Sequence, residues 1–328
     1  MLKSMVRGTL AAAIICAATA VQAEVSSISI GVQHGVAYLP LQVVGINHLV
    51  EKHAKLLGIP LTATVINLGQ AGMIRDALIA GQIQFGVAGP PTLVTMHDKT
   101  KGDIKAIGAV VSVPIYLNTA NPKIKKVCDF GEGDKIALPT IKSSVQAVTL
   151  QMAAKKQCGD PFKVDSFTVG MTHPDGYNAL MSGMVSTHMT TPPYSFAELE
   201  KGKGKIRLIL NSYDVLGAKS TLVLLLGSDK FRQENPKVYQ AMRDALEEGE
   251  AFVRQKPKEA AAIYLKVEKS KETYAEVMKQ IASPEIVYTT TPIALGKYAK
   301  FMFDIGTVKT DYSWKDLSMP DLQAKKGS

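Results

Sequence analysis

The sequence is poor in cysteine and lacks the residue patterns on which most catalytic sites depend. It has three cysteines and one tryptophan in 328 residues. It contains no Gly-x-Ser-x-Gly elbow, no glycine-rich phosphate loop followed by Lys-Ser or Lys-Thr, and no pair of carboxylates on the loops where a ligand is expected. His48 and His53 lie five residues apart around Glu51, so on a helix they point to different faces and make a poor metal pair. We therefore expect no enzyme activity, no metal and no cofactor.

The chain also lacks a concentrated patch of positive charge. Its formal net charge is +9. The lysines fall in short runs at 123–126, 201–205 and 325–326, without interleaved aromatic residues. A nucleic-acid partner is not expected, whereas the mild basic excess is compatible with attraction of anionic solutes.

The first 23 residues have the composition of a cleavable secretion signal. Lys3 and Arg7 form a basic beginning, residues 10–20 are apolar but too few to span a bilayer, and Val21-Gln22-Ala23 is a small-x-small cleavage site. We expect a soluble periplasmic protein that begins near Glu24.

The three cysteines have different expected fates. Cys16 lies inside the apolar run after Ile15, where lipoprotein processing needs a small residue, so lipidation is the weaker interpretation. Cys128 precedes a predicted strand and Cys158 ends the helix that follows, which places both at the same end of one strand-helix unit. In an oxidising compartment this pair favours a disulfide, which would stabilise the fold by roughly 3 kcal/mol through loop closure. Two buried free thiols are the alternative.

One sequence pattern occurs twice. The segment 77–81, Ala-Leu-Ile-Ala-Gly, reappears at 179–183 as Ala-Leu-Met-Ser-Gly, and Gly89-Pro90-Pro91 reappears as Thr191-Pro192-Pro193. In both copies a helix leads into a short apolar strand that ends at Pro-Pro. We therefore expect two similarly built α/β halves, with the loops after these strands facing one another.

Strands and helices alternate along the chain. Apolar runs predict strands over 27–32, 62–67, 83–87, 107–113, 115–118, 136–138, 166–169, 185–189, 206–210 and 222–226. Helical patterns cover 39–57, 73–80, 145–156, 177–181, 235–253, 257–267, a segment up to 281, and 292–303. This order predicts parallel sheets with helices on both faces, and ligands in such sheets bind beyond the carboxyl ends of the strands. The expected division is lobe 1 over 24–113 and 217–328, and lobe 2 over 114–216.

Four loops are expected to meet at one cleft. Ser143-Ser144 stands at a helix start, where free backbone amides attract anions, although a serine there is also an ordinary helix cap. Gly69-Gln70 and Gly35 let the backbone approach a ligand closely, and Thr190-Thr191 with Gln33 supply neutral donors. Lys142 and His173 are the cationic candidates, and a solvated lysine and a loop-capping histidine are their alternatives. The predicted ligand-binding residues are Gln33, His34, Tyr38, Gly69, Gln70, Gly89, Pro90, Ser112, Lys142, Ser143, Ser144, His173, Thr190, Thr191, Pro192 and Tyr213.

The chain resembles the nitrate, sulfonate and taurine class of periplasmic substrate-binding proteins. The resemblance rests on the secretion signal, the segment Gln33-His34-Gly35-Val36-Ala37-Tyr38-Leu39-Pro40, the Ala-Leu-x-x-Gly helix, Ser143-Ser144, and the helix start at 231–236. It implies a type II periplasmic binding protein fold with two lobes, each built on a mostly parallel sheet. It further implies that the cleft between the lobes closes over a small anion, such as a sulfonate or taurine-like compound, and delivers it to the permease of an ABC importer. A monomer is expected.

Two positions depart from the family's pattern and bear on the ligand. The glycine common before the paired serines is Lys142 here, and the second-lobe loop reads Thr190-Thr191-Pro192-Pro193 instead of ending in an aromatic and an acidic residue. A thiamine-precursor pyrimidine or a carboxylate therefore stays open as the ligand. An enzyme on the same fold would need a cluster of Cys or His, and a transcriptional regulator would begin with a helix-turn-helix, so both are weaker alternatives.

Overall fold

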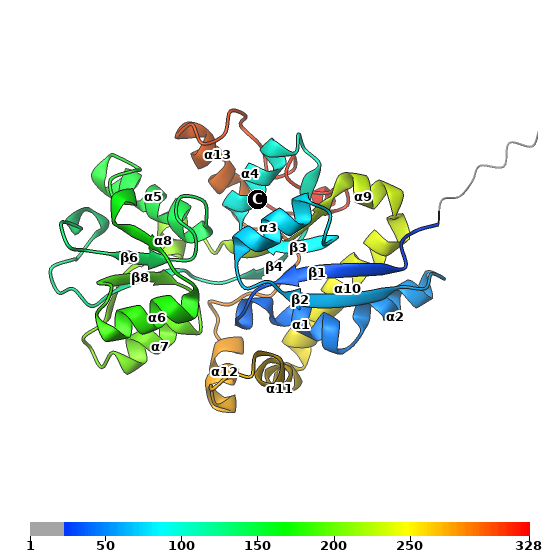
Figure 1. The fold of residues 1–328 in the computed structure, drawn as a ribbon, viewed down its shortest axis with the longest axis horizontal. Helices are drawn as coiled ribbons and strands as arrows, with labels where there is room; N and C mark the ends of the chain where they lie inside the picture. The colour runs from blue at the N-terminus through cyan, green and yellow to red at the C-terminus, as the bar shows by residue number, and fades with distance from the viewer. Residues whose placement is uncertain (1–22) are drawn as a thin grey trace, which may run out of the picture.

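Two five-stranded sheets lie side by side along the long axis of the molecule (Figure 1). The computed structural model describes residues 23–328, so the predicted secretion signal, apart from Ala23, lies outside the described residues. The first sheet has the order β2 (Thr62–Asn67), β1 (Ser27–Val32), β3 (Phe85–Ala88), β10 (Thr221–Ser228) and β4 (Ile104–Ser112). The second has the order β7 (Thr168–Gly170), β6 (Ile136–Leu138), β8 (Thr187–Thr190), β5 (Tyr116–Thr119) and β9 (Arg207–Asn211).

Both sheets are mixed, whereas strand-helix alternation predicted parallel ones. In the first sheet β1 runs parallel to β2 and β3, but β10 is antiparallel to both β3 and β4. In the second, β6 is parallel to β7 and β8, while β5 is antiparallel to β8 and β9. The antiparallel strands β5 and β10 each begin just after the chain has crossed from one sheet to the other, so no crossover helix sets their direction.

Helices cover both faces of each sheet. Around the first sheet lie α1 (Leu39–Ile46), α2 (Leu49–Leu56), α3 (Ala71–Ile79), α4 (Pro90–Lys99), α9 (Asp229–Glu234) and α10 (Pro236–Gln255), and around the second α5 (Val145–Cys158), α6 (His173–Ser182), α7 (Tyr194–Lys201) and α8 (Ser212–Leu216) (Figure 1). The remaining helices are α11 (Pro257–Glu268), α12 (Tyr274–Ile281) and α13 (Leu295–Asp304), and the short 3-10 turns are η1 (Val36–Tyr38), η2 (Val127–Asp129), η3 (Asp165–Phe167) and η4 (Leu322–Ala324). None of the helices of residues 23–328 is long and apolar enough to span a membrane.

The predicted elements differ from the structure mainly at chain reversals. The single helix predicted over 39–57 is two helices, because His48 adopts the left-handed conformation (φ 51°) between α1 and α2. A strand ends before each Pro-Pro step as predicted, β3 at Ala88 and β8 at Thr190, but a helix also begins at each step. Helix α4 begins at Pro90, and α7 begins directly after Pro193. Proline suits the first positions of a helix because its missing N–H would have no partner there.

The sequence repeat is exact in the structure. Strands β3 (85–88) and β8 (187–190) start and end at positions that differ by 102 residues, and each follows a helix of the repeat, α3 or α6. The buried apolar residues of β3 belong to the main apolar core, which also includes residues of strand β10 and of one face of helix α10. The two halves are therefore built on the same local plan.

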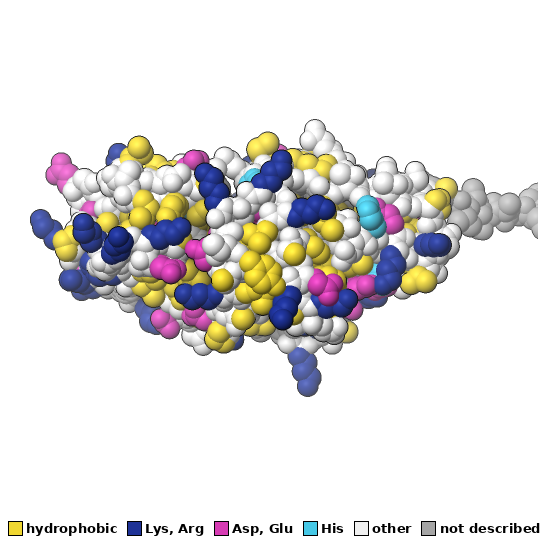
Figure 2. Space-filling view, turned by 90° about the horizontal axis from the view of Figure 1, so that it is seen from below, with side chains coloured by type: hydrophobic (Ala, Val, Ile, Leu, Met, Phe, Trp, Pro, Cys, Tyr) yellow, Lys and Arg dark blue, Asp and Glu magenta, His cyan; other side chains and the backbone are white. Residues whose placement is uncertain are grey.

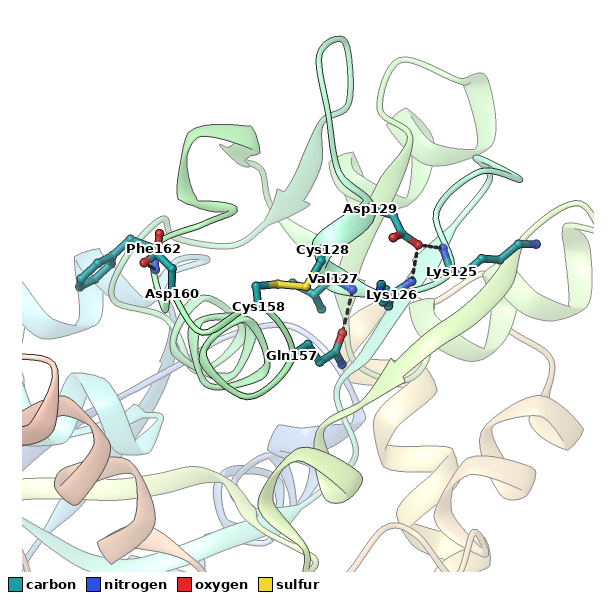
Figure 3. The surroundings of a disulfide bond; sticks show 9 residues. All are labelled: Lys125, Lys126, Val127, Cys128, Asp129, Gln157, Cys158, Asp160 and Phe162. Carbon is teal, nitrogen blue, oxygen red and sulfur yellow. Dashed lines mark hydrogen bonds between the residues drawn. A yellow bond between two sulfur atoms is a disulfide. The ribbon is translucent and has the colours of Figure 1, made fainter.

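Cys128 and Cys158 form a disulfide that joins η2 to the end of α5 (Figure 3). Their Cα atoms are 5.7 Å apart. Beside the bond, the Gln157 side chain accepts a hydrogen bond from the Val127 amide at 2.9 Å. The disulfide lies within the unit of the second sheet, so it stabilises that unit without linking the two sheets.

Charged side chains of both signs are dispersed over the surface. On the face seen in Figure 2, lysine and arginine side chains alternate with acidic ones and with apolar areas. This distribution matches the scattered lysines of the sequence.

Candidate functional site

One small cavity lies between the two sheets. Its volume is about 50 Å³, whereas a single water needs roughly 10–15 Å³. In this arrangement it therefore has room for a solute of a few non-hydrogen atoms. The lining residues are Gln33, His34, Gly35, Ala37, Tyr38, Ala71, Ala88, Gly89, Thr92, Pro139, Ser144, Val145, Gln146, His173, Thr191, Pro192, Tyr194, Leu222 and Val223.

Five helices begin at this cavity, two beside the first sheet and three beside the second. Ala71 is the first residue of α3, and Gly89 caps the start of α4. Ser144 caps α5, while His173 and Tyr194 are the first residues of α6 and α7. The first amides of a helix have no partner within the helix, although Pro90, Pro91 and Pro174 carry no N–H in α4 and α6. The aligned peptide dipoles make each start partly positive. The cavity wall therefore favours a negatively charged or electron-rich group.

Local sequence explains why these helices start where they do. The Ser144 side chain accepts a hydrogen bond from the Ala147 amide at 3.1 Å, and the Thr172 side chain accepts one from the Asp175 amide at 3.3 Å. Prolines occupy the first two helical positions of α4 and the second position of α6. Capping side chains and early prolines fix the residues at which the helices begin. The strands that precede these helices end at the cavity, so the helices begin there.

The two units touch directly beside the cavity. The Thr92 hydroxyl on α4 donates to the Ser143 carbonyl at 3.3 Å, and the Thr149 hydroxyl on α5 is 2.9 Å from that of Tyr298 on α13. Gly89 lies so close to Val145 that a Cβ added to it would be 1.9 Å from the Val145 Cγ2 atom. The start of α4 and the start of α5 thus form a tight contact across the cavity edge.

Half of the predicted ligand-binding residues line the cavity. They are Gln33, His34, Tyr38, Gly89, Ser144, His173, Thr191 and Pro192. Gly89 and Thr191 are equivalent positions of the sequence repeat, so the two repeated loops meet at one cavity.

Four other predicted residues lie next to the lining without being part of it. Ser143 contributes its carbonyl to the contact with Thr92, and the Thr190 hydroxyl is 2.6 Å from the His173 Nδ1 atom. Pro90 is buried as the first residue of α4. Lys142 is exposed and has the left-handed conformation (φ 65°) just before Ser143.

The remaining four predicted residues lie away from the cavity. Gly69 and Gln70 are exposed in the turn before α3, so Ala71 is the residue of this loop that reaches the lining. Ser112 is fully buried at the end of β4, and its amide and carbonyl both bond to Val287 at 2.8 Å. The Tyr213 hydroxyl donates to the Glu285 carbonyl at 2.8 Å. Ser112 pairs with Val287 because the backbone groups of a buried strand end need partners.

Sequence reasoning missed several lining residues. Thr92 follows the first Pro-Pro step and Tyr194 follows the second. Proline is common at the start of a helix, so each step predicts a helix start with the next residue beside the site. Gln146 lies two residues after Ser144, in the first turn of the same helix. Leu222 and Val223 lie on the buried strand β10, and no local signal distinguishes them from core residues.

No Lys, Arg, Asp or Glu is among the described residues that line the cavity. Burial, together with the nearby His188, lowers the pKa of His173 to about 3, so its imidazole is neutral at neutral pH. The ring of His173 stacks on Tyr194, with centroids 5.9 Å apart and planes at 13°. Burial, and then the negative charges of Glu268 and Glu272, raise the pKa of Tyr194 to about 12, so its hydroxyl stays protonated. Apart from His34, which is paired with Glu268, the lining therefore offers neutral donors and acceptors.

Glu268 fixes the loop that forms one wall of the cavity. Its carboxylate accepts from the Gly35 amide at 3.2 Å and from the Gln42 side chain at 2.5 Å, and its Oε2 atom is 2.8 Å from the His34 Nδ1 atom. The Glu268 side chain is 8% exposed, whereas that of His34 is 56% exposed. Gly35 has a φ of 117°, which favours glycine. The last residue of α11 thus sets the path of the chain between Gln33 and Tyr38.

In residues 23–328, no three side chains of His, Cys, Asp or Glu are close enough together to hold a metal ion.

Solved structures with the same architecture are periplasmic binding proteins. The alkanesulfonate-binding protein SsuA of Xanthomonas axonopodis pv. citri, bound to MOPS, is 17% identical with a TM-score of 0.73, over 90% of this chain and 99% of that one. The periplasmic aliphatic sulphonate binding protein SsuA of Escherichia coli is 17% identical with a TM-score of 0.67, over 93% and 96%. The periplasmic nitrate-binding protein NrtA of Synechocystis PCC 6803 is 14% identical with a TM-score of 0.73, over 91% and 87%. At these identities the likeness shows the fold alone.

Sequence comparison assigns the family. No curated protein is similar to the chain by sequence. The family model described as NMT1/THI5 like matches residues 61–260, more than half of the chain, from strand β2 through the cavity-lining loops to the start of α11. With the periplasmic binding protein fold around it, this match shows that the chain belongs to the NMT1/THI5-like family.

Proposed function

We propose that the protein is the solute-binding component of an ABC importer. It captures a small organic anion, such as a sulfonate or taurine-like compound, between two lobes and delivers it to the membrane permease. In this proposal it is a periplasmic monomer released from its secretion signal, with lobe 1 over 24–113 and 217–328 and lobe 2 over 114–216. Binding without chemical conversion is proposed because no Lys, Arg, Asp or Glu is among the described lining residues.

The observation that carries the proposal is the meeting of five helix starts at a cavity whose described lining includes no Lys, Arg, Asp or Glu. Helix starts stabilise an anion through backbone N–H groups and peptide dipoles, so no counter-charge has to be buried. Because two starts belong to one sheet and three to the other, a ligand held by all of them joins the two lobes. Binding energy then favours the closed arrangement over an open one.

A second ligand class has support from the same cavity. Tyr38, Tyr194 and the neutral His173 place aromatic rings in the lining, and no Lys, Arg, Asp or Glu is among the described lining residues. Aromatic rings favour flat, weakly charged solutes. A thiamine-precursor pyrimidine or a carboxylate is therefore the second ligand class, and the NMT1/THI5-like family match is compatible with it.

The proposal is tested by calorimetric titration with an alkanesulfonate, taurine, nitrate, a monocarboxylate and an aminopyrimidine. One class should bind, and Thr191→Val should weaken that binding about ten- to a hundredfold, the effect of losing a hydrogen bond to a charged group. Ser143→Ala is the matched control, because Ser143 reaches the cavity edge through its carbonyl only. Equal affinity of wild type and Thr191→Val would remove the second-sheet loop from the site. Preference for the pyrimidine would replace the anion by the second ligand class.

A further inference from the structure

Residues 284–290 run beside both connections between the two sheets, and we call this segment the strap. The chain passes from β4 to β5 through residues 113–115, and returns from α8 to β10 through residues 217–220. The strap follows α12 and contacts Ser112, just before the first connection, and Lys219 in the second. It is therefore a third element at the place where one sheet can rotate against the other.

The strap is firmly attached to the first sheet. Val287 and Ser112 exchange two backbone hydrogen bonds, each 2.8 Å, and the Ala109 amide donates to the Thr290 carbonyl at 2.9 Å. The Tyr288 hydroxyl, buried in the core, donates to the Val36 carbonyl at 3.4 Å. Val36 lies in η1, between the cavity-lining residues Gly35 and Tyr38. The strap thus moves with the first sheet and with the ligand-binding loop that this sheet carries.

The same strap is bonded to the unit of the second sheet by two tyrosines. The hydroxyl of Tyr116, the first residue of β5, donates to the Glu285 carboxylate at 2.8 Å. The hydroxyl of Tyr213, in α8, donates to the Glu285 carbonyl at 2.8 Å. Beside them, the Lys219 ammonium donates to the Pro284 carbonyl at 2.6 Å. Burial and the adjacent Glu285 raise the pKa of Tyr116, which keeps its hydroxyl protonated as a donor.

We propose that Glu285, held by Tyr116 and Tyr213, is a latch that stabilises the present arrangement of the two sheets. The latch bonds bridge both connections, so bending at 113–115 or 217–220 has to break them. The strap passes from Glu285 to Val287 and Tyr288 within three residues, and so connects the latch to the η1 wall of the cavity. Breaking the latch bonds therefore also loosens the η1 wall of the cavity. In this scheme the residues that control closure are not the residues that contact the ligand.

The latch is tested without any ligand, by hydrogen exchange and small-angle scattering of Tyr116→Phe, Tyr213→Phe and Glu285→Gln. Each variant keeps the shape of the side chain and removes or weakens one latch bond. We expect amide exchange in 284–290 and 113–118 to accelerate about tenfold in Tyr116→Phe and Glu285→Gln, which change a hydrogen bond to a charged group. The effect of Tyr213→Phe should be smaller, because its hydroxyl bonds to a neutral carbonyl. The radius of gyration should increase in all three variants. The double variant Tyr116→Phe with Glu285→Gln should show less than the sum of the two single effects, because both remove the same bond.

Tyr239→Phe is the matched control. Its hydroxyl donates to the Asp321 carboxylate at 2.6 Å, a bond of the same kind that involves neither the strap nor a connection. It should lower stability without changing exchange in the strap or the radius of gyration. The proposal is overturned if Tyr116→Phe and Tyr213→Phe behave like Tyr239→Phe. Because no solute enters the experiment, its result is independent of whether the proposed ligand class is correct.

Discussion

Replacing Gly89 by alanine should block the contact between the two halves while leaving each half folded. Gly89 has φ −82° and ψ 165°, an extended conformation that alanine adopts without strain. The added Cβ would nevertheless lie 1.9 Å from Val145 Cγ2 and 3.2 Å from the Leu222 carbonyl oxygen. Valine is stiff about its first side-chain torsion, so it cannot move aside cheaply. The overlap is relieved by moving α4 and α5 apart.

The Gly89→Ala substitution should raise the free energy of the closed arrangement, in which α4 contacts α5. Overpacking of a buried contact costs about 1–3 kcal/mol, which corresponds to a population shift of roughly five- to 150-fold. Gly89→Ala should therefore increase the radius of gyration measured by small-angle scattering and weaken affinity for the cognate solute by a similar factor. Gly131→Ala is the control, because a Cβ there meets nothing within 4 Å.

A second substitution separates the steric explanation from general damage. Val145→Ala removes the atom that the new Cβ would meet, so Gly89→Ala combined with Val145→Ala should recover much of the lost compaction and affinity. If Gly89→Ala alone binds and scatters like the wild type, then the contact between α4 and α5 is not required in the ligand-bound state and the reasoning is refuted.

Three further predictions concern stability. Removing the disulfide with Cys128→Ser and Cys158→Ser should lower the free energy of unfolding by roughly 3–4 kcal/mol on the loop-closure model, as measured by denaturant titration; an unchanged value would show that the bond adds nothing. The pKa of His173, about 3 in the fold, lies below its unfolded value of about 6.5, so the stability that it contributes is present above pH 6.5 and is lost as the pH falls toward 3. His173→Gln should therefore flatten the dependence of melting temperature on pH in that window. An identical dependence in the variant would contradict a buried neutral imidazole. Ser144→Ala should cost about 1 kcal/mol through loss of the cap, whereas Ser143→Ala should not, and equal melting temperatures would mean that the cap bond to Ala147 is not formed in solution.

The order of elements and the repeated halves could be predicted from sequence because both depend on local patterns. Apolar runs indicated β1, β2 and β10, and the Ala-Leu-x-x-Gly repeat indicated that the loops at Gly89 and Thr191 are equivalent. The direction of β5 and β10 could not be predicted, since it depends on how the chain crosses between sheets rather than on any residue in the strand.

The candidate site could be predicted only where a loop carries its own signal. Ser144 and His173 follow turns with helix-start residues, and both line the cavity. Ser112 and Tyr213 were predicted to bind the ligand, but the backbone of Ser112 and the hydroxyl of Tyr213 bond to the strap, a segment more than seventy residues further along the chain. Such pairings are decided by tertiary contacts that no local pattern records.

The central claim is that the cavity between the two sheets holds one small solute. It is tested most directly by mass spectrometry of the small molecules released when natively purified protein is denatured, comparing wild type with Thr191→Leu, in which a larger side chain fills part of the cavity. The account predicts one small solute, near one per protein in wild type and strongly depleted in Thr191→Leu. Release of the same solute in equal amounts from both proteins would place the binding site elsewhere and contradict the account.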